Sequence, residues 1–286
     1  MRVVTIEVSG QEQAALWTDQ GVIPLTWVNG QFGTNWDTDL FALLQTNQFN
    51  ELRRWYDHSG QEHLTSLPCL SGIDVCYRAL YRHPGKIIGV GMNYWAKAIE
   101  LSGRPPEDEP VIFLKPDTSL IGAGETIRLP DGAGQITAEA ELAIVIGQTC
   151  RNIHEEEALS VIAGYTTSLD MTAKEIHARN PRFMQRAKSF DTFLSLGSSL
   201  STPDEYRNLN DLEIETLHNG IVAHSNTVNR MIFSPAYLIS FLSKVMTLHP
   251  GDVILTGTPG SVTIQAGDTV GCRIVGLKPL DNVVEG

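Results

Sequence analysis

Two glutamates and one aspartate stand at spacings that can hold a metal ion. Glu139 and Glu141 lie two residues apart in ITAEAELAIVIG, and Asp170 ends the run GYTTSLD. Side chains alternate between the two faces of a strand, so both glutamates project from one face. Like charges this close disfavour each other's ionised form, and a cation relieves the repulsion. Oxygen ligands without a cysteine or histidine pattern favour Mg²⁺, Mn²⁺ or Ca²⁺ over zinc.

The same spacing also fits an ordinary half-buried strand. In that interpretation Leu142, Ile144 and Ile146 point into a core. The two glutamates share the opposite face with Ala143 and Val145 and are simply solvated. Spacing alone therefore leaves a metal site and a solvated surface as alternatives.

A short helix after the strand KIIGVG carries a second group of polar side chains. Asn93, Lys97 and Glu100 are three or four residues apart, so they share one face of that helix. Taken alone, Lys97 and Glu100 are explained by an exposed salt bridge, which contributes only about a few tenths of a kcal/mol.

Cations and a hydroxyl follow the aspartate along the chain. A helical turn with Lys174 and His177 comes after Asp170, and Lys188 precedes the segment SFDT. A lysine beside an acidic metal centre can bind a substrate oxyanion, although it can equally be a peripheral counter-ion. Thr258 stands in a glycine-bounded turn after the strand VIL, where its hydroxyl and the neighbouring amides can hold a carboxylate.

The elements that position these residues follow from hydrophobic periodicity. Residues 2 to 8 and 21 to 28 are predicted to be strands, and residues 37 to 55 a helix with a leucine stripe. The irregular segment 58 to 84 contains Gly and Pro turns, which indicates a domain boundary. We therefore expect a small α/β module at residues 1 to 80 and a main domain at residues 85 to 286.

Two local signals in the main domain are specific. Asn219-Gly220 between alternating strands predicts a two-residue type I′ hairpin. Ser234 followed by Pro235 predicts a helix start, with serine as the N-cap and proline at the first helical position.

Size and charge exclude several classes of partner. The 286 residues carry a formal charge of −12 and no basic run, so nucleic acid and anionic lipid are poor partners. The amino terminus lacks the pattern of a signal peptide and no apolar run is long enough to span a membrane, so we expect a cytoplasmic protein. The four cysteines show no C-x-x-C pattern, which fits reduced thiols.

Six stretches of the main domain occur in an order and spacing that resemble the fumarylacetoacetate hydrolase family. They are GVGMNYWAKAIE, PVIFLKP with the following IGAGETIRLP, EAELAIVIG, AGYTTSLDMTA, KSFDTF and DVILTGTPG. The resemblance covers residues 86 to 286 and favours the metal site over the solvated strand.

The resemblance implies a mixed α+β, mostly β fold, in which a rolled β-sandwich surrounds the metal centre, and a homodimer. It implies Mg²⁺ or Mn²⁺ bound by Glu139, Glu141 and Asp170, and a small carboxylate substrate such as a 2-oxo acid, acylpyruvate or diketo acid. Lys188 matches the lysine that stabilises the developing oxyanion, and Lys174 replaces a common arginine. We expect substrate contacts from Asn93, Tyr94, Lys174, His177, Thr192 and Thr258.

One position departs from the family pattern. Many of its hydrolases and decarboxylases read Asn-Tyr-x-x-His-x-x-Glu, whose His and Glu activate water, but here Lys97 takes the histidine position ahead of Glu100. A lysine is normally protonated at neutral pH and cannot act as a base unless burial or a metal changes that. We expect hydrolysis of a C–C bond with Lys97, Glu100 and Lys188 as catalytic residues. Decarboxylation, tautomerisation or isomerisation of a 2-oxo acid and a catalytically silent protein are the alternatives.

Overall fold

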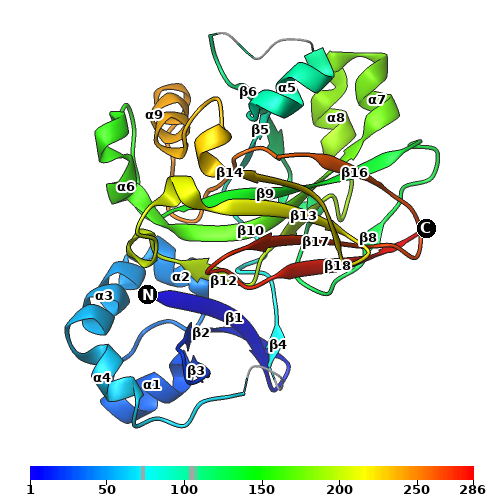
Figure 1. Cartoon of the computed structure of the whole chain (residues 1–286). Coiled ribbons are helices and arrows are strands. Elements are labelled where there is room, and N and C mark those ends of the chain that lie inside the picture. Colours follow the sequence, from blue (N-terminus) through cyan, green and yellow to red (C-terminus); the bar gives the residue numbers. More distant parts are fainter. Residues whose placement is uncertain (72–74, 103–105, 107) are drawn as a thin grey trace.

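A computed structural model describes residues 1–71, 75–102, 106 and 108–286, and the side chains of residues 100–102 lie outside that description. In this part of the chain the strands form a large sheet and a smaller one (Figure 1). The large sheet has the order β3-β2-β1-β12-β10-β9-β15-β5-β6, with β4, β7, β11 and β16 paired alongside. The smaller sheet has the order β14-β13-β17-β18-β8.

The strands have the following bounds: β1 Arg2–Val8, β2 Gln11–Trp17, β3 Val22–Pro24, β4 Cys76–Tyr77, β5 Ile87–Gly91, β6 Val111–Lys115, β7 Leu120–Ile121, β8 Ile127–Arg128, β9 Ile136–Ile146, β10 Ile162–Ala173, β11 Leu194–Leu196, β12 Ser199–Ser201, β13 Glu213–His218, β14 Ile221–Thr227, β15 Val253–Leu255, β16 Ser261–Ile264, β17 Thr269–Ile274 and β18 Leu280–Glu285. The α-helices are α1 Leu25–Phe32, α2 Leu40–Gln45, α3 Gln48–Trp55, α4 Gln61–Leu64, α5 Trp95–Ser102, α6 Ala158–Val161, α7 Lys174–Arg179, α8 Met184–Lys188 and α9 Pro235–Val245.

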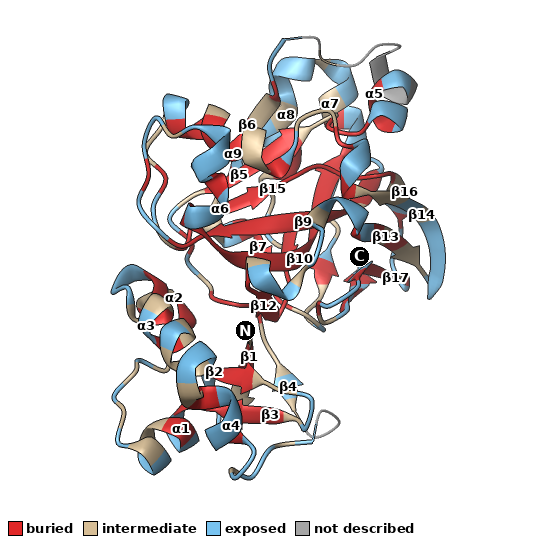
Figure 2. Ribbon diagram, turned by 60° about the vertical axis from the view of Figure 1, so that its left-hand side comes forward, coloured by how far each residue is buried: buried red, intermediate tan, exposed pale blue. Residues whose placement is uncertain are grey.

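The antiparallel pair of β9 and β10 is the centre of the fold. These two strands are the longest, and nearly all their residues are buried (Figure 2). Leu142, Ile144 and Ile146 enter the larger core, which the smaller sheet also lines. Ala143 and Val145 enter a second core. The strand is therefore buried on both faces, so its two glutamates are not part of a solvated sheet face.

The amino-terminal part joins the same sheet. β1 pairs with β12 in the register Arg2↔Ser201, and the second core combines residues of the amino-terminal part with Ala143 and Val145 of β9. Sheet and core thus run across the boundary that the sequence suggested between residues 80 and 85. The predicted α+β fold, with its mixture of sheets and helices, is confirmed.

Two predictions for the amino-terminal part are wrong in detail. The sequence predicts a strand at residues 21–28, but only Val22–Pro24 is extended and α1 begins at Leu25. Leu25 and Val28 are both buried, and their spacing of three is a helical period that the strand prediction overlooked. Gly33, with φ +64°, ends the helix.

The helix predicted for residues 37–55 is divided. Asn47 has a φ of +63° and separates α2 from α3. Asparagine tolerates this left-handed conformation better than most residues, so it can end one helix and begin the next. The predicted leucine stripe is nevertheless buried.

Both specific local signals are confirmed. Asn219 and Gly220 have φ values of +52° and +77° between β13 and β14, as a type I′ turn requires. The Ser234 hydroxyl accepts a hydrogen bond from the Tyr237 amide at 3.1 Å, and Pro235 is the first residue of α9.

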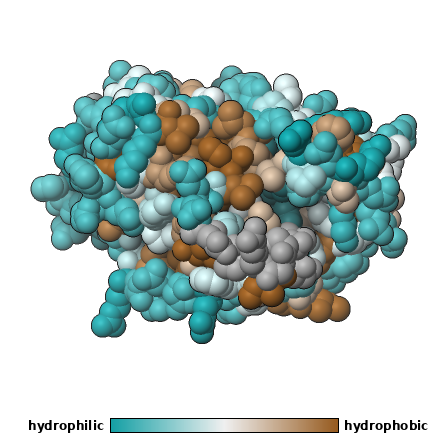
Figure 3. All heavy atoms as spheres, turned by 90° about the horizontal axis from the view of Figure 1, so that it is seen from above, coloured by the Kyte–Doolittle hydropathy of each residue, from teal (hydrophilic) through white to brown (hydrophobic). Residues whose placement is uncertain are grey.

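Helices α5, α7 and α8 lie together at the top of the molecule, above β9 and β10 (Figures 1 and 2). Seen from above, this end has an apolar area surrounded by polar surface (Figure 3). No helix in the described ranges is long and apolar enough to cross a membrane. The three helices are thus the elements that can bring side chains onto the polar end of β9 and β10.

Candidate metal centre

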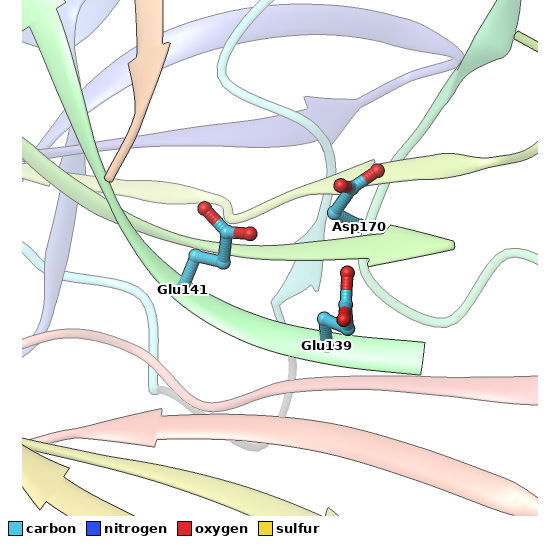
Figure 4. A group of neighbouring side chains, drawn as sticks. All are labelled: Glu139, Glu141 and Asp170. Atoms are coloured by element: carbon cyan, nitrogen blue, oxygen red, sulfur yellow. The ribbon is translucent and has the colours of Figure 1, made fainter. Parts of the chain in front are cut away.

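The fold brings the three predicted carboxylates together. Asp170 of β10 stands directly opposite Glu139 of β9, and Ser168 stands opposite Glu141. Directly opposite residues project to the same face of a sheet, so all three acids share one face. Figure 4 shows the two glutamates rising from β9 beside Asp170. One oxygen from each carboxylate lies within 4.8 Å of the others.

Glu141 is the most deeply placed of the two glutamates. Its side chain is buried, and its Oε2 accepts a hydrogen bond from the Gly257 amide at 2.6 Å. Burial raises the pKa of Glu141 well above its usual range, and Asp170 and Glu139 raise it further. A cation at this point would relieve both the desolvation and the repulsion.

Lys188, the last residue of α8, bridges the other two acids. Its Nζ donates to Glu139 Oε2 at 2.9 Å, to Asp170 and to the Thr172 hydroxyl at 2.7 Å. Burial disfavours the charged ammonium, but Asp170 and Glu139 outweigh it and raise the pKa of Lys188. Lys188 is therefore a fixed positive charge at the edge of the acid cluster.

A second lysine, Lys115 at the end of β6, lies beneath Asp170. Its Nζ donates to Asp170 Oδ1 at 2.7 Å and to the Lys188 carbonyl, and its side chain is fully buried. Burial lowers the pKa of Lys115. For Asp170, burial would raise the pKa, but Lys115 and Lys188 together hold it below its usual range. The cluster therefore combines an ionised aspartate with two glutamates.

This donor set fits a divalent cation. It consists of carboxylates alone, which are ligands that Mg²⁺ and Mn²⁺ prefer. Each carboxylate oxygen has two lone pairs, so the lysine contacts leave positions for a metal. Glu139, Glu141 and Asp170 are thus the residues that would hold the ion.

Known proteins resemble most of this chain. Residues 86–285 match the sequence profile of the fumarylacetoacetate (FAA) hydrolase C-terminal domain. The chain belongs to the fumarylacetoacetate hydrolase family. An oxaloacetate tautomerase, mitochondrial fahd2 of Xenopus laevis, is 38% identical over 224 residues, which are 75% of this chain and 70% of that protein.

Solved structures of similar proteins cover the whole chain. A 5-carboxymethyl-2-hydroxymuconate delta-isomerase from Mycobacterium smegmatis is 32% identical with a TM-score of 0.75, covering 100% of this chain and 98% of that one. A maleylpyruvate hydrolase from Sphingobium sp. SYK-6, in complex with manganese(II) and pyruvate, is 26% identical with a TM-score of 0.81, covering 100% and 99%. Relatives in the fumarylacetoacetate hydrolase family thus include a tautomerase, an isomerase and a hydrolase.

Lys97, which the family resemblance aligns with a dyad histidine, points toward β16. Its side chain is buried, and Nζ donates to the Ser261 hydroxyl at 2.9 Å. Glu100 lies in α5, but its side chain is outside the described residues. The catalytic roles expected of the pair stay predictions.

Two residues just before α5 pack inward. The Asn93 amide donates to the Phe233 and Thr256 carbonyls at 3.0 and 2.8 Å and accepts from the Phe233 amide at 2.8 Å. Its side chain therefore ties two loops together, and the substrate contact expected of Asn93 stays a prediction. Tyr94 is fully buried, and burial followed by Glu141 raises the pKa of its hydroxyl.

The expected substrate-binding residues of α7 differ in placement. Lys174 is exposed at the first position of the helix. His177 is partly buried, and its Nε2 has no hydrogen-bond partner among the described residues. Burial, and then Lys188, lower the pKa of His177, so the ring is neutral at pH 7. A neutral imidazole with an unpaired nitrogen can exchange a proton with a ligand.

The two threonines also differ. Thr192 has a φ of +67°, and its hydroxyl accepts a hydrogen bond from the Arg128 amide at 2.9 Å. Thr258 is buried one residue beyond Gly257, and its hydroxyl donates to the Gly260 carbonyl at 2.9 Å. The structure thus places Thr258 beside Glu141, while it engages Thr192 with β8.

Sequence reasoning missed two contributors to the site, Lys115 and Ser261. It did expect the amides beside Thr258 to hold a carboxylate, and the Gly257 amide holds that of Glu141. Lys115 had a readable signal, because it continues the alternation Val111, Phe113 of an apolar strand face, where lysine is rarely buried without a partner. Ser261 had none, since its contact with Lys97 joins residues 164 positions apart.

Gly257 combines a left-handed backbone with close packing. Its φ is +93°, and a Cβ atom there would lie 2.8 Å from Asn93 Cβ and 3.1 Å from the Val90 carbonyl. We expect Gly257→Ala to lose about 1–3 kcal/mol of stability. It should also weaken Mn²⁺ binding about 10-fold, because the amide that orients Glu141 moves. Thermal unfolding and calorimetric Mn²⁺ titration measure both effects.

Gly267→Ala is the matched control. Gly267 has a similar φ of +91°, but a Cβ atom there would meet nothing within 4 Å. The Gly267→Ala variant should therefore lose stability and keep its affinity for Mn²⁺. Equal Mn²⁺ affinities for the two variants would contradict the role given to the Gly257 amide.

Proposed function

We propose that this protein is a divalent-metal-dependent enzyme that enolises a small dicarboxylic 2-oxo acid, with oxaloacetate as the leading substrate. The observation that carries the proposal is the cluster of three carboxylates with Lys188 bound to two of them. The similarity to an oxaloacetate tautomerase supports the substrate. We further propose the homodimer that the family resemblance implies.

The side chains support each part of an enolisation. A cation held by the three acids would supply a Lewis acid beside the keto oxygen. The Lys188 ammonium, fixed by Glu139 and Thr172, would donate to the same oxygen as negative charge develops there. The C3 proton needs an acceptor, and the neutral His177 ring with its unpaired Nε2 supports that role.

Hydrolysis of an acylpyruvate, the reaction that the sequence analysis placed first, is the second candidate. The similarity to a manganese-containing maleylpyruvate hydrolase favours it. It requires a base that activates water, however, and the family's histidine is replaced by Lys97, whose Nζ acts as a donor to Ser261. Tautomerisation needs no activated water, so the site supports it better.

The test follows oxaloacetate tautomerisation and the exchange of its C3 hydrogens in D₂O. We expect both rates to rise with Mg²⁺ or Mn²⁺ and to return to the uncatalysed rate in chelator. His177→Gln should slow exchange about 10²-fold or more, since general-base catalysis contributes 10²–10⁴-fold.

An acylpyruvate assayed in H₂¹⁸O distinguishes the two candidates. Cleavage that places ¹⁸O in the product acid, without tautomerisation of oxaloacetate, would replace the first candidate with the second. Tautomerisation that is insensitive to chelator would overturn the metal-dependent mechanism itself.

A further inference from the structure

A row of polar side chains crosses three strands at the candidate centre. Ser261 of β16 stands opposite Glu139 of β9, which in turn stands opposite Asp170 of β10. Opposite residues share a face, so the Ser261 hydroxyl lies on the same face as the carboxylates. The row therefore has a hydroxyl at one end and a carboxylate at the other.

Each end of this row holds a buried lysine from a different helix. At the Asp170 end, Lys188 of α8 contacts Asp170 and Glu139. At the Ser261 end, Lys97 of α5 donates to the hydroxyl at 2.9 Å, and only 6% of Lys97 is exposed. Neighbouring strands are about 4.8 Å apart, so Ser261 stands roughly 5 Å from Glu139 and roughly 10 Å from Asp170 along the row. A four-carbon dicarboxylic acid fits a row of that length.

The serine is held in place by the smaller sheet. Its carbonyl accepts a hydrogen bond from His224 Nε2 of β14 at 3.1 Å. The preceding Gly260 carbonyl accepts from the Thr216 hydroxyl at 3.1 Å, and the His224 ring packs where a Gly260 side chain would be. The hydroxyl that meets Lys97 therefore belongs to a segment anchored from both sides.

We propose that Lys97, positioned by Ser261, recognises the second carboxylate of a dicarboxylic 2-oxo acid. This inference rests on the proposed function, in which the first carboxylate and the keto group occupy the Lys188 end. Hydrogen bonds between an ammonium and a carboxylate are among the strongest in proteins, and burial strengthens them. A monocarboxylic acid cannot make this charged hydrogen bond with Lys97, so the pair selects dianionic substrates.

The test compares oxaloacetate with 2-oxobutyrate, which has the same four carbons and lacks the second carboxylate. C3 hydrogen exchange in D₂O gives kcat and KM for both. We expect Lys97→Met and Ser261→Ala to raise KM for oxaloacetate about 10–100-fold, the usual effect of losing a charged hydrogen bond. Neither variant should change kcat or KM for 2-oxobutyrate by more than about twofold. Equal loss of kcat on both substrates would overturn the proposal and place Lys97 in proton transfer.

Control variants separate positioning from structure. Lys244→Met on the exposed side of α9 and Ser66→Ala, a serine with one local hydrogen bond, should match the wild type. Ser261→Thr keeps a hydroxyl and should restore KM. In the Lys97→Met variant, the further change Ser261→Ala should not raise KM for oxaloacetate again, because the serine acts through the lysine. Additive effects would overturn the positioning role.

A binding measurement keeps the inference independent of turnover. Calorimetry of the Mn²⁺-loaded protein with L-malate and 2-hydroxybutyrate, which do not enolise, should show a 10–100-fold preference for malate that Lys97→Met removes. A preference for malate in a protein that does not turn over oxaloacetate would support carboxylate recognition by Lys97 and reject the proposed function. Turnover of oxaloacetate without a preference for malate would reject recognition by Lys97 and support the proposed function. If neither turnover nor preference is found, both proposals are rejected.

Discussion

Glu141→Gln is expected to abolish metal-dependent turnover, by at least about 100-fold, while leaving the protein folded. The glutamine has the shape of the glutamate, and its amide oxygen can still accept the Gly257 hydrogen bond. It lacks the negative charge that a divalent cation requires. Calorimetric Mn²⁺ titration and the oxaloacetate assay should show loss of metal binding and turnover together.

Although Glu141→Gln should abolish turnover, it should not lower the stability of the metal-free protein. In the metal-free protein, burial and then Asp170 and Glu139 raise the pKa of Glu141, so its ionised form costs stability at neutral pH. The glutamine removes this cost, and the metal-free variant should unfold at an equal or higher temperature than the wild type.

The pH dependence follows from the same shift. Between the unfolded pKa of about 4.3 and the raised folded value, the folded state holds a proton that the unfolded state has lost. Wild-type stability relative to Glu141→Gln should therefore increase as pH falls through the folded pKa of Glu141 and level off below about pH 4.3. A metal-free variant much less stable than the wild type at pH 7 would contradict this.

Lys188→Met is expected to have the second largest effect. The substitution removes the ammonium that contacts Glu139, Asp170 and Thr172, leaving buried carboxylates with less positive charge. Breaking a buried ion pair costs about 3–5 kcal/mol, so the metal-free variant should unfold at a much lower temperature. Mn²⁺ should restore most of that stability, because the cation supplies positive charge to the same carboxylates.

Turnover should not recover with the metal. Loss of one donor to a developing oxyanion costs about 10²–10³-fold, so the Mn²⁺-loaded variant should stay at least about 100-fold slower. Lys188→Arg keeps the positive charge, so this variant should fold normally in the metal-free form. Lys244→Met controls for the loss of an exposed lysine. Wild-type turnover of Lys188→Met at saturating Mn²⁺ would remove Lys188 from the mechanism.

Strand periodicity was sufficient to predict that Glu139 and Glu141 share a face. It could not place Asp170, because that depends on the register of β10 against β9, which is set by packing across the whole strand pair. The position of Asp170 after an apolar run made it a possible third ligand, the family resemblance supported it, and the observed register brings it opposite Glu139. That the three acids bind a metal stays a prediction.

Contacts between elements far apart in the chain could not be predicted from the sequence. Lys97 meets Ser261 only because α5 and β16 come together at the same end of the sheet. Asn93 belongs to a readable motif, yet its amide is used by loops more than 130 residues away. The strand predicted at residues 21–28 failed for a local reason, since apolar residues there fit both periods until packing selected the helix.

The proposed function requires that three carboxylates hold a divalent cation at which a 2-oxo acid is enolised. The most direct test titrates the chelator-treated protein with Mn²⁺ and follows both bound metal and C3 hydrogen exchange of oxaloacetate. We expect exchange to rise in proportion to a single bound ion, and Glu141→Gln to show neither binding nor exchange. Exchange at full rate before Mn²⁺ is added, or undiminished in Glu141→Gln, would contradict it.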